Sequence, residues 1–286
     1  MLRNLTLVVQ LFAIGPLVAG AITLLRAADG GNAVTPLLSE SPLMGALAGL
    51  LVVAGACVIG LVDARFFGAR SGLAGAGVVL GWAALYSGRT EDLLRLYPAG
   101  WVSAAMMIEG LVASAAVIWS VQRMARAASA GTASGTDRTA WRTLVSQTSI
   151  LAVVAGVVAG GVVAYFVAFY GSKGQTLFAG SMAGIAAGAA AAVVSAGSDG
   201  SKPVADPVFS AAVAMALLAV IGPATIVGLH SDPLGSALAG TLRPLGHLNA
   251  FDWTGGALMG IPIGLGWAGA HAQAHTVTTP TATAAS

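Results

Sequence analysis

The chain has 286 residues, of which 57% are hydrophobic and only 8% are charged, and its mean hydropathy is +0.85. This composition excludes a water-soluble domain of that length, because such a domain needs more charged surface. The formal net charge of +2 comes from arginines scattered through polar segments, which argues against a nucleic-acid-binding surface. We therefore predict an all-α, polytopic transmembrane helix bundle that forms one domain, residues 1–286.

Eight apolar segments are the candidate membrane spans, since about 20 residues of helix cross roughly 30 Å of hydrocarbon. They are residues 5–25, 43–62, 71–86, 101–121, 150–170, 176–196, 208–229 and 253–270. The first has some features of a cleavable signal peptide, but it is long enough to be retained as a span. The third is short and the eighth is rich in glycine, so a count of seven or six crossings stays open.

Polar segments between the spans contain no second folded domain. Residues 122–149 are expected to be a cytoplasmic linker that includes the small-residue run Ala127 to Thr136, and residues 271–286 a polar C-terminal tail. The sequence Thr90-Glu91-Asp92, followed by LLRLYP, is typical of a short, capped interfacial helix with acids in its first turn. The apolar stretch from Pro233 to Leu248 either lies on the surface or dips into the bundle.

The distribution of Lys and Arg gives the orientation. With the N-terminus in the cytoplasm, eight of the 13 basic residues fall on the cytoplasmic side, four of them in the linker. This excess has the sign of the positive-inside rule. We expect a multi-pass protein of a bacterial-type inner membrane with both termini in the cytoplasm.

Glycines recur at intervals of four residues, which places them on one face of a helix. One stripe is Gly180, Gly184 and Gly188, and the other is Gly256, Gly260 and Gly264. Small residues allow close contact between helices in lipid, so we predict that both stripes are helix-packing surfaces. The alternative is that glycine together with Pro16, Pro223 and Pro262 breaks helices midway and frees backbone carbonyls to line a cavity.

Glu109 is the only charged residue inside one of these long apolar segments, and an acid at membrane depth is a candidate functional site. It is a hydrogen-bonded carboxyl within the bundle, a proton or cation site on a translocation path, or a salt-bridge partner. The last is disfavoured, because no Lys or Arg lies within another apolar segment. Candidate polar neighbours are Ser103, Ser114, Gln10 and Ser181.

Other chemistry-bearing residues give weaker indications. His230 with Asp232, and His247 with Asp252, could hold a metal, but their spacing does not require one, and we expect both pairs to form a solvated rim. The single cysteine, Cys57, is expected to be a small buried hydrophobic residue. We predict no metal site and no cofactor.

The sequence contains no set of residues typical of an enzyme. There is no phosphate-binding P-loop, no HExxH motif and no Ser-His-Asp or Cys-His set that could meet at membrane depth.

Two hypotheses for the function remain. The first is a small-solute or proton-coupled permease with Glu109 on the path; the second is a non-catalytic subunit or scaffold whose glycine faces bind other membrane-protein subunits. In both, the lipid bilayer is the main partner and nucleic acid is not one.

Overall fold

The structure is a computed structural model that describes residues 2–32, 34–130, 146–197 and 206–277. These residues form helices, turns and connecting segments, with no β-strand among them. The long helices are α3 (Pro42–Phe67), α4 (Ala69–Tyr86), α6 (Ala99–Ala130), α8 (Gln147–Val167), α9 (Lys173–Ala196), α10 (Pro207–Gly228) and α13 (Ala257–Val277). Short helices are α5 (Thr90–Leu96), α11 (Pro233–Leu238), α12 (Pro244–His247) and the 3-10 turn η3 (Pro36–Leu38).

The first helix is built from four segments that follow one another without a gap. These are α1 (Leu2–Val9), the π-helical η1 (Gln10–Ile14), α2 (Gly15–Ala19) and the 3-10 segment η2 (Gly20–Leu24). A second π-helical segment, η4 (Asp252–Gly256), leads into α13. Both π segments lie close to glycine or proline, which relax the ordinary hydrogen-bond ladder of a helix.

Six helices have the length and composition of a membrane span. They are Leu2–Leu24, Pro42–Phe67, Ala99–Ala128, Gln147–Val167, Lys173–Ala196 and Pro207–Gly228. Helices α4 and α13 occupy the third and eighth expected segments but are not among these six. Helix α4 has only 18 residues, includes Arg70, and is buried over most of its length, so it has the character of a core helix.

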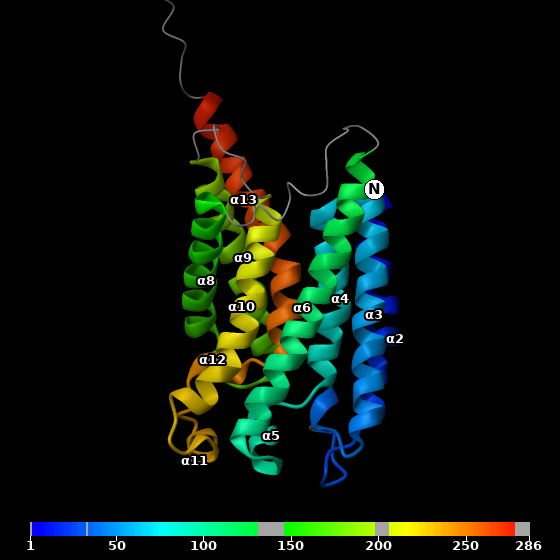
Figure 1. Cartoon of the computed structure of the whole chain (residues 1–286), viewed down its shortest axis with the longest axis vertical. Coiled ribbons are helices and arrows are strands. Elements are labelled where there is room, and N and C mark those ends of the chain that lie inside the picture. The colour runs from blue at the N-terminus through cyan, green and yellow to red at the C-terminus, as the bar shows by residue number, and fades with distance from the viewer. Residues whose placement is uncertain (1, 33, 131–145, 198–205, 278–286) are drawn as a thin grey trace, which may run out of the picture.

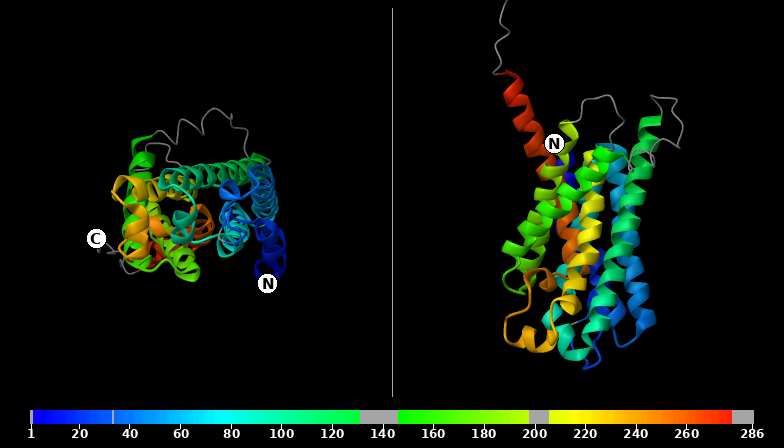
Figure 2. Two further views of the ribbon diagram at one scale, coloured as in Figure 1. Left: turned by 90° about the horizontal axis from the view of Figure 1, so that it is seen from below. Right: turned by 60° about the vertical axis from the view of Figure 1, so that its left-hand side comes forward.

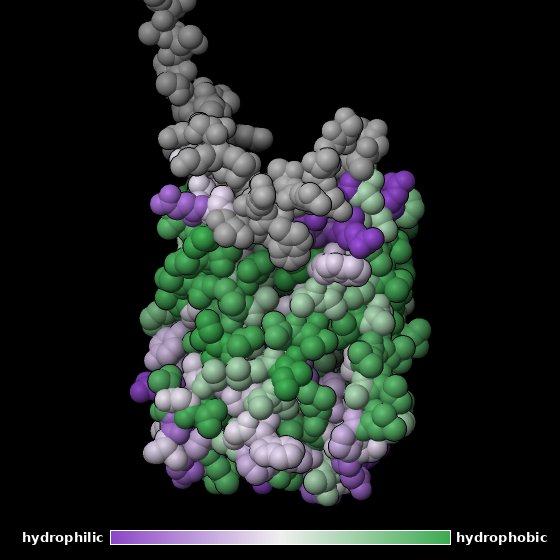
Figure 3. Space-filling view, viewed as in Figure 1, coloured by the Kyte–Doolittle hydropathy of each residue, from purple (hydrophilic) through white to green (hydrophobic). Residues whose placement is uncertain are grey.

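The surface of the bundle is apolar where a soluble protein would be polar. Large hydrophobic side chains such as Leu43, Leu50, Phe66 and Phe166 are more than half exposed. Figure 3 shows, on the face it presents, a broad hydrophobic band between two more polar ends. Apolar side chains that point outward in this way are what a lipid environment favours, and the chain has the character of a membrane-embedded helical protein.

The helices run along one long axis (Figures 1 and 2), and the α3–α4, α8–α9, α9–α13 and α6–α10 pairs have extensive contacts. Helices α5, α11 and α12 gather at one end, which we call the α5 end. The N-terminal residues lie at the opposite end (Figure 1). The connections α4–α5–α6, α8–α9 and α10–η4 therefore meet at the α5 end.

Several segment boundaries differ from the sequence-based expectation. Helix α6 continues to Ala130 and α8 begins at Gln147, so both ends of the expected linker 122–149 are helical; residues 131–145 lie outside the described part. Helix α13 continues to Val277, so the expected tail 271–286 begins as helix, and residues 278–286 are outside the description.

The short helix predicted after Thr90 is present as α5, with Glu91 and Asp92 in its first turn. Thr90 does not cap it, because Arg89 occupies the N-cap position and the Thr90 hydroxyl donates to the carbonyl of His247.

Candidate functional site

The carboxyl group of Glu109 lies inside the bundle and is 7% exposed. Its position ten residues after the start of α6 places it about 15 Å along the helix. Oε1 accepts a hydrogen bond of 2.7 Å from the backbone N–H of Leu37. Oε2 is buried without a hydrogen-bond partner among the described residues, as is the hydroxyl of the fully buried Thr35. The acid is therefore capped by the segment that contains η3.

The segment from residue 34 to residue 41 packs closely against the start of helix α3, because Gly45 and Gly49 have no side chains there, and in this position it reaches Glu109. A Cβ atom built on Gly45 would overlap the carbonyl of Pro36, and one built on Gly49 would lie 2.9 Å from the Pro36 side chain. The short turn η3 thus packs against the glycine face at the start of α3, and its first N–H groups point to α6. An N–H group at the start of a helical turn has no partner within the turn, so a carboxylate satisfies it well.

Three of the four polar neighbours expected for Glu109 bond to other groups, and the fourth, Ser114, is buried in α6. Ser103 donates to the carbonyl of Pro223 at 2.8 Å, Gln10 donates to Asp63, and Ser181 donates to the carbonyl of Leu177. The groups that face the carboxyl come instead from Thr35 and Leu37, in a connection that the hydropathy pattern leaves undefined.

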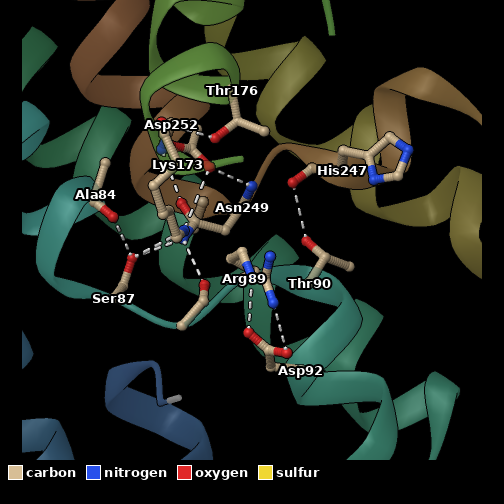
Figure 4. A network of polar contacts seen from close by, with 12 residues as sticks. Ala84, Ser87, Arg89, Thr90, Asp92, Lys173, Thr176, His247, Asn249 and Asp252 are labelled. Atoms are coloured by element: carbon tan, nitrogen blue, oxygen red, sulfur yellow. Dashed lines mark hydrogen bonds and ion pairs between the residues drawn. The ribbon is translucent and has the colours of Figure 1, made fainter. Parts of the chain in front are cut away.

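A second polar cluster lies at the α5 end and joins four parts of the chain (Figure 4). Lys173, at the start of α9, has its Nζ 3.6 Å from Oδ2 of Asp252, a residue with no exposed surface. The same Nζ lies 3.4 Å from Oγ of Ser87, which follows α4. Figure 4 shows Ser87, Lys173, Asn249 and Asp252 pointing toward one another. A buried ion pair of this kind needs further hydrogen bonds to offset the loss of solvation.

Asn249 supplies those hydrogen bonds by capping the helix that leads into η4. Its side-chain Oδ1 accepts from the N–H of Asp252 at 2.8 Å, and its own N–H donates to Oδ2 of Asp252 at 3.0 Å. This reciprocal pair is a capping box, with Asn at the N-cap and an acid three residues later. The Asn249 amide also donates to Oγ of Ser87 at 2.6 Å and to the carbonyl of Gly88 at 3.3 Å.

His247 belongs to the edge of the same cluster. Its Nδ1 lies 3.4 Å from Oε1 of Glu91, and its side chain is 4% exposed. Burial lowers the pKa of His247 from its ordinary value, and the nearby Glu91 carboxylate opposes part of that effect. The expectation that His247 and Asp252 form a solvated rim is therefore wrong: the turn after α12 folds both side chains inward.

The remaining candidate ligands do not form a metal-binding group. Among the described residues, no three His, Cys, Asp or Glu side chains are arranged to hold a metal ion. His230 is bound by Ser236 and by the N–H of Arg243. Cys57 is partly buried in α3.

A run of short contacts joins the Glu109 site to the cluster at the α5 end. The N–H of Gly88 donates to the carbonyl of Val34 at 2.7 Å, three residues before Leu37. The carbonyl of Gly88 in turn accepts from Asn249, which binds Asp252. Movement of residues 34–37 would therefore disturb both the Glu109 contact and the position of Gly88.

The predicted glycine stripes lie against each other between α9 and the η4–α13 segment. A Cβ on Gly188 would lie 2.6 Å from the carbonyl of Ile261, and one on Gly256 would lie 2.7 Å from the carbonyl of Leu177. Gly180, Gly184, Gly260 and Gly264 are equally close to backbone atoms of the facing segment. At these six positions the two backbones leave no space for a side chain.

The predicted helix-break residues have different surroundings. Helix α10 continues through Pro223 and α13 through Pro262. Pro16 is the second residue of α2, which begins at Gly15 directly after the π-helical segment η1, so the departure from α-helical geometry ends two residues before that proline.

Two open cavities lie elsewhere on the bundle, and neither is lined by Glu109. One, of about 380 Å³, includes Leu24, Arg26, Glu40 and Met44 in its lining. The other, of about 490 Å³, lies between α6 and α10 and includes Leu111, Trp119 and Val213. In this conformation Glu109 is closed off.

Comparison of the chain with protein-family models, with curated proteins and with solved structures gives no match.

Proposed function

We propose that the chain is a proton-coupled permease for a small solute, and that Glu109 is the group that takes up and releases the proton. The observation that carries the proposal is the surroundings of its carboxyl. It is buried in the first third of α6, and no cationic side chain lies within 4.0 Å among the described residues. Oε2 makes no hydrogen bond of standard geometry, and the side chain that faces the carboxyl is the neutral Thr35. An ionisable group is costly at membrane depth, which is why such groups are concentrated on ion and proton pathways.

The conformation with Glu109 closed off corresponds, in this proposal, to an occluded state. Residues 34–37 cover the carboxyl, and the hydrogen bond from the Leu37 N–H is stronger to a charged acceptor than to a neutral one. Protonation of Glu109 would weaken this contact and favour release of the segment. Because Val34 contacts Gly88, release would also loosen the Ser87–Asn249–Asp252 cluster at the α5 end.

The proposed architecture has eight crossings, with α4 and α13 packed against several of the six helices that have the length and composition of a membrane span. Close packing of the two glycine stripes would hold α13 against α9 inside the bundle. We place the N-terminus and the connection between α6 and α8 in the cytoplasm, which puts the α5 end outside, in a bacterial-type inner membrane. The proposal assigns the protein no enzymatic reaction.

The alternative, a non-catalytic subunit or scaffold, has less support. It depends on glycine faces that are free to bind partner subunits, and in this structure the six stripe glycines face neighbouring backbone of the same chain. A partner would have to bind another surface, such as the apolar groove between α6 and α10.

The test needs no knowledge of the solute, since an acidic pH jump drives protons into any coupled carrier. Purified protein is reconstituted into liposomes on a sensor membrane, and the transient current after the jump is recorded. We expect a current from the wild type that is lost in Glu109→Gln, with the exposed position Glu40→Gln as the control that retains it. The proposal would be contradicted if the correctly folded wild type gives no current, or if Glu109→Gln gives a current equal to that of the wild type.

A further inference from the structure

A second buried acid, Asp63, lies in α3 near the end opposite α5. Its side chain is 1% exposed, and Gln10, the first residue of η1, is 2% exposed. The Nε2 of Gln10 lies 3.0 Å from both Oδ1 and Oδ2 of Asp63. The pair connects the first helix to α3 within the bundle and is separate from the Glu109 site, whose contacts come from residues 34–37.

The charge of Asp63 has no partner of opposite sign. Among the described residues, no Lys, Arg or His nitrogen lies within 4.0 Å of its carboxyl, and the basic residues next along the chain, Arg65 and Arg70, are exposed. The side chain facing it from η1 is the neutral Gln10, and α4 presents Gly75. One amide donor does not offset the burial of a full charge.

A second oxygen at this site also lacks a partner. Oε1 of Gln10 is buried and accepts no hydrogen bond from the described residues. A Cβ atom built on Gly75 would overlap Oδ2 of Asp63 and would lie 3.1 Å from Oε1 of Gln10. The carboxylate oxygen and the amide oxygen therefore both face α4 at Gly75, and only a residue without a side chain lets them approach its backbone.

The backbone around Gln10 departs from α-helical geometry. The N–H of Gly15 bonds to the carbonyl of Gln10, which leaves the carbonyl of Leu11 without its usual partner, and the indole N–H of Trp82 donates to that carbonyl at 2.8 Å. Such π-helical turns are frequent at functional sites because they re-aim side chains and free backbone groups. Here the turn directs Gln10 inward to Asp63.

We propose that Asp63 and Gln10 form a binding site for a small monovalent cation, a proton or Na⁺, beside Gly75. The cation supplies the charge that Asp63 lacks and gives the free amide oxygen of Gln10 a partner. Hard oxygen ligands of this kind suit both occupants. The evidence for cation binding is the geometry of these two side chains. A role of the site in coupling cation movement to solute transport rests on the proposed permease function.

Carbodiimide labelling tests the site without a known solute, because dicyclohexylcarbodiimide attaches to buried carboxyl groups only when they are protonated and accessible. The full-length Glu109→Gln protein in detergent is labelled from about pH 8 to about pH 5, and the peptide that contains Asp63 is measured by mass spectrometry. We expect labelling to increase as the pH falls, by about tenfold per unit on the alkaline side of the midpoint, as the protonated fraction does.

Replacement of choline chloride by sodium chloride at the same ionic strength distinguishes the two occupants. If Na⁺ binds, labelling falls several-fold at constant pH; if only a proton binds, sodium has no effect. Gln10→Leu should move the pH midpoint of labelling upward, since it removes the donor that favours the ionised form, and Asp63→Asn should abolish the labelled peptide.

The proposed cation site would be contradicted if Asp63 is not labelled at any pH in the folded protein but is fully labelled after denaturation. An unchanged midpoint in Gln10→Leu would exclude Gln10 from it. Because this measurement uses the Glu109→Gln background, loss of the proton current described above leaves its outcome unaffected, and the two proposals fail separately.

Discussion

At the scale of single residues, Glu109 shows how an acid can be tolerated in an apolar helix without a cation. The carboxyl accepts the main-chain N–H of Leu37, a group that no side chain needs to supply. That partner could not be predicted from the sequence, because Leu37 belongs to a connection with no periodic pattern. The burial of an acid in segment 101–121 was predictable, since the surrounding run is continuously apolar.

Removing the acceptor at Glu109 should destabilise the bundle. In Glu109→Leu the Leu37 N–H loses its partner, which costs about 1–3 kcal/mol. Glu109→Gln keeps a side-chain carbonyl acceptor and should stay within about 1 kcal/mol of the wild type. Unfolding in a detergent and denaturant titration, followed by tryptophan fluorescence, measures both variants. Equal stability of the two would mean that the contact to Leu37 contributes nothing.

Burial of His247 should make stability fall at acid pH. The unfolded chain takes up a proton near pH 6.5, whereas the folded form, in which burial lowers the pKa of His247, takes it up only at a lower pH. Between these values the unfolded state binds more protons, so stability rises with pH in that window and is lost as the pH falls below about 6.5.

The check is the midpoint of thermal unfolding in detergent between about pH 7.5 and about pH 5.5. His247→Gln should reduce the pH dependence, and the control His230→Gln, which alters a histidine bound by Ser236 near the surface, should retain it. A wild-type midpoint that does not change over this range would contradict the expected burial cost.

At the scale of secondary-structure elements, the long helices follow from hydropathy, and the irregular segments do not. Seven of the eight expected segments lie on a helix, although α6 continues nine residues beyond the expected segment 101–121. A continuous apolar run has only one way to satisfy its backbone in lipid. The eighth begins as the π-helical η4. The π segments η1 and η4 depend on contacts with Trp82 and with α9, which lie far away in the sequence.

The cluster of Lys173 with Asp252 does not follow from the hydropathy pattern, for a related reason. Each residue lies at the edge of an apolar segment, where a charge is usually solvated. The pattern of Asn249 followed three residues later by Asp252, just before an apolar run, does indicate a capped helix start, and this was the available clue to their burial.

Contact between α9 and α13 should be sensitive to a single methyl group. In Gly184→Ala the new Cβ overlaps backbone atoms of Ala257, and such overpacking costs about 1–3 kcal/mol. Gly266→Ala, in α13 with no atom within 4 Å of the new Cβ, is the matched control and should not lose stability. Thermal unfolding in detergent compares them; an unaffected Gly184→Ala would mean that the helices separate easily.

At the scale of the whole molecule, the proposed eight crossings require that α4, which is not one of the six helices with the length and composition of a span, also crosses the membrane. This predicts that Arg70, in the first turn of α4, and Arg95, in α5 beyond its other end, lie on opposite sides of the membrane. In a Cys57→Ala background, a membrane-impermeant maleimide should label Arg95→Cys in intact cells and Arg70→Cys only after permeabilisation. Labelling of both from one side would show that α4 does not cross, and a reversed pattern would invert the orientation.

The central claim is that Glu109 takes up and releases a proton inside the folded bundle. Infrared difference spectroscopy of the protein in lipid measures this directly, because the C=O stretch of a protonated carboxyl is distinct from that of a carboxylate. We expect a carboxylic-acid band that grows as the pH is lowered, disappears reversibly as it is raised, and is missing in Glu109→Gln, whereas a band from Asp63 is present in both proteins. Identical pH-dependent spectra from wild type and Glu109→Gln would contradict it.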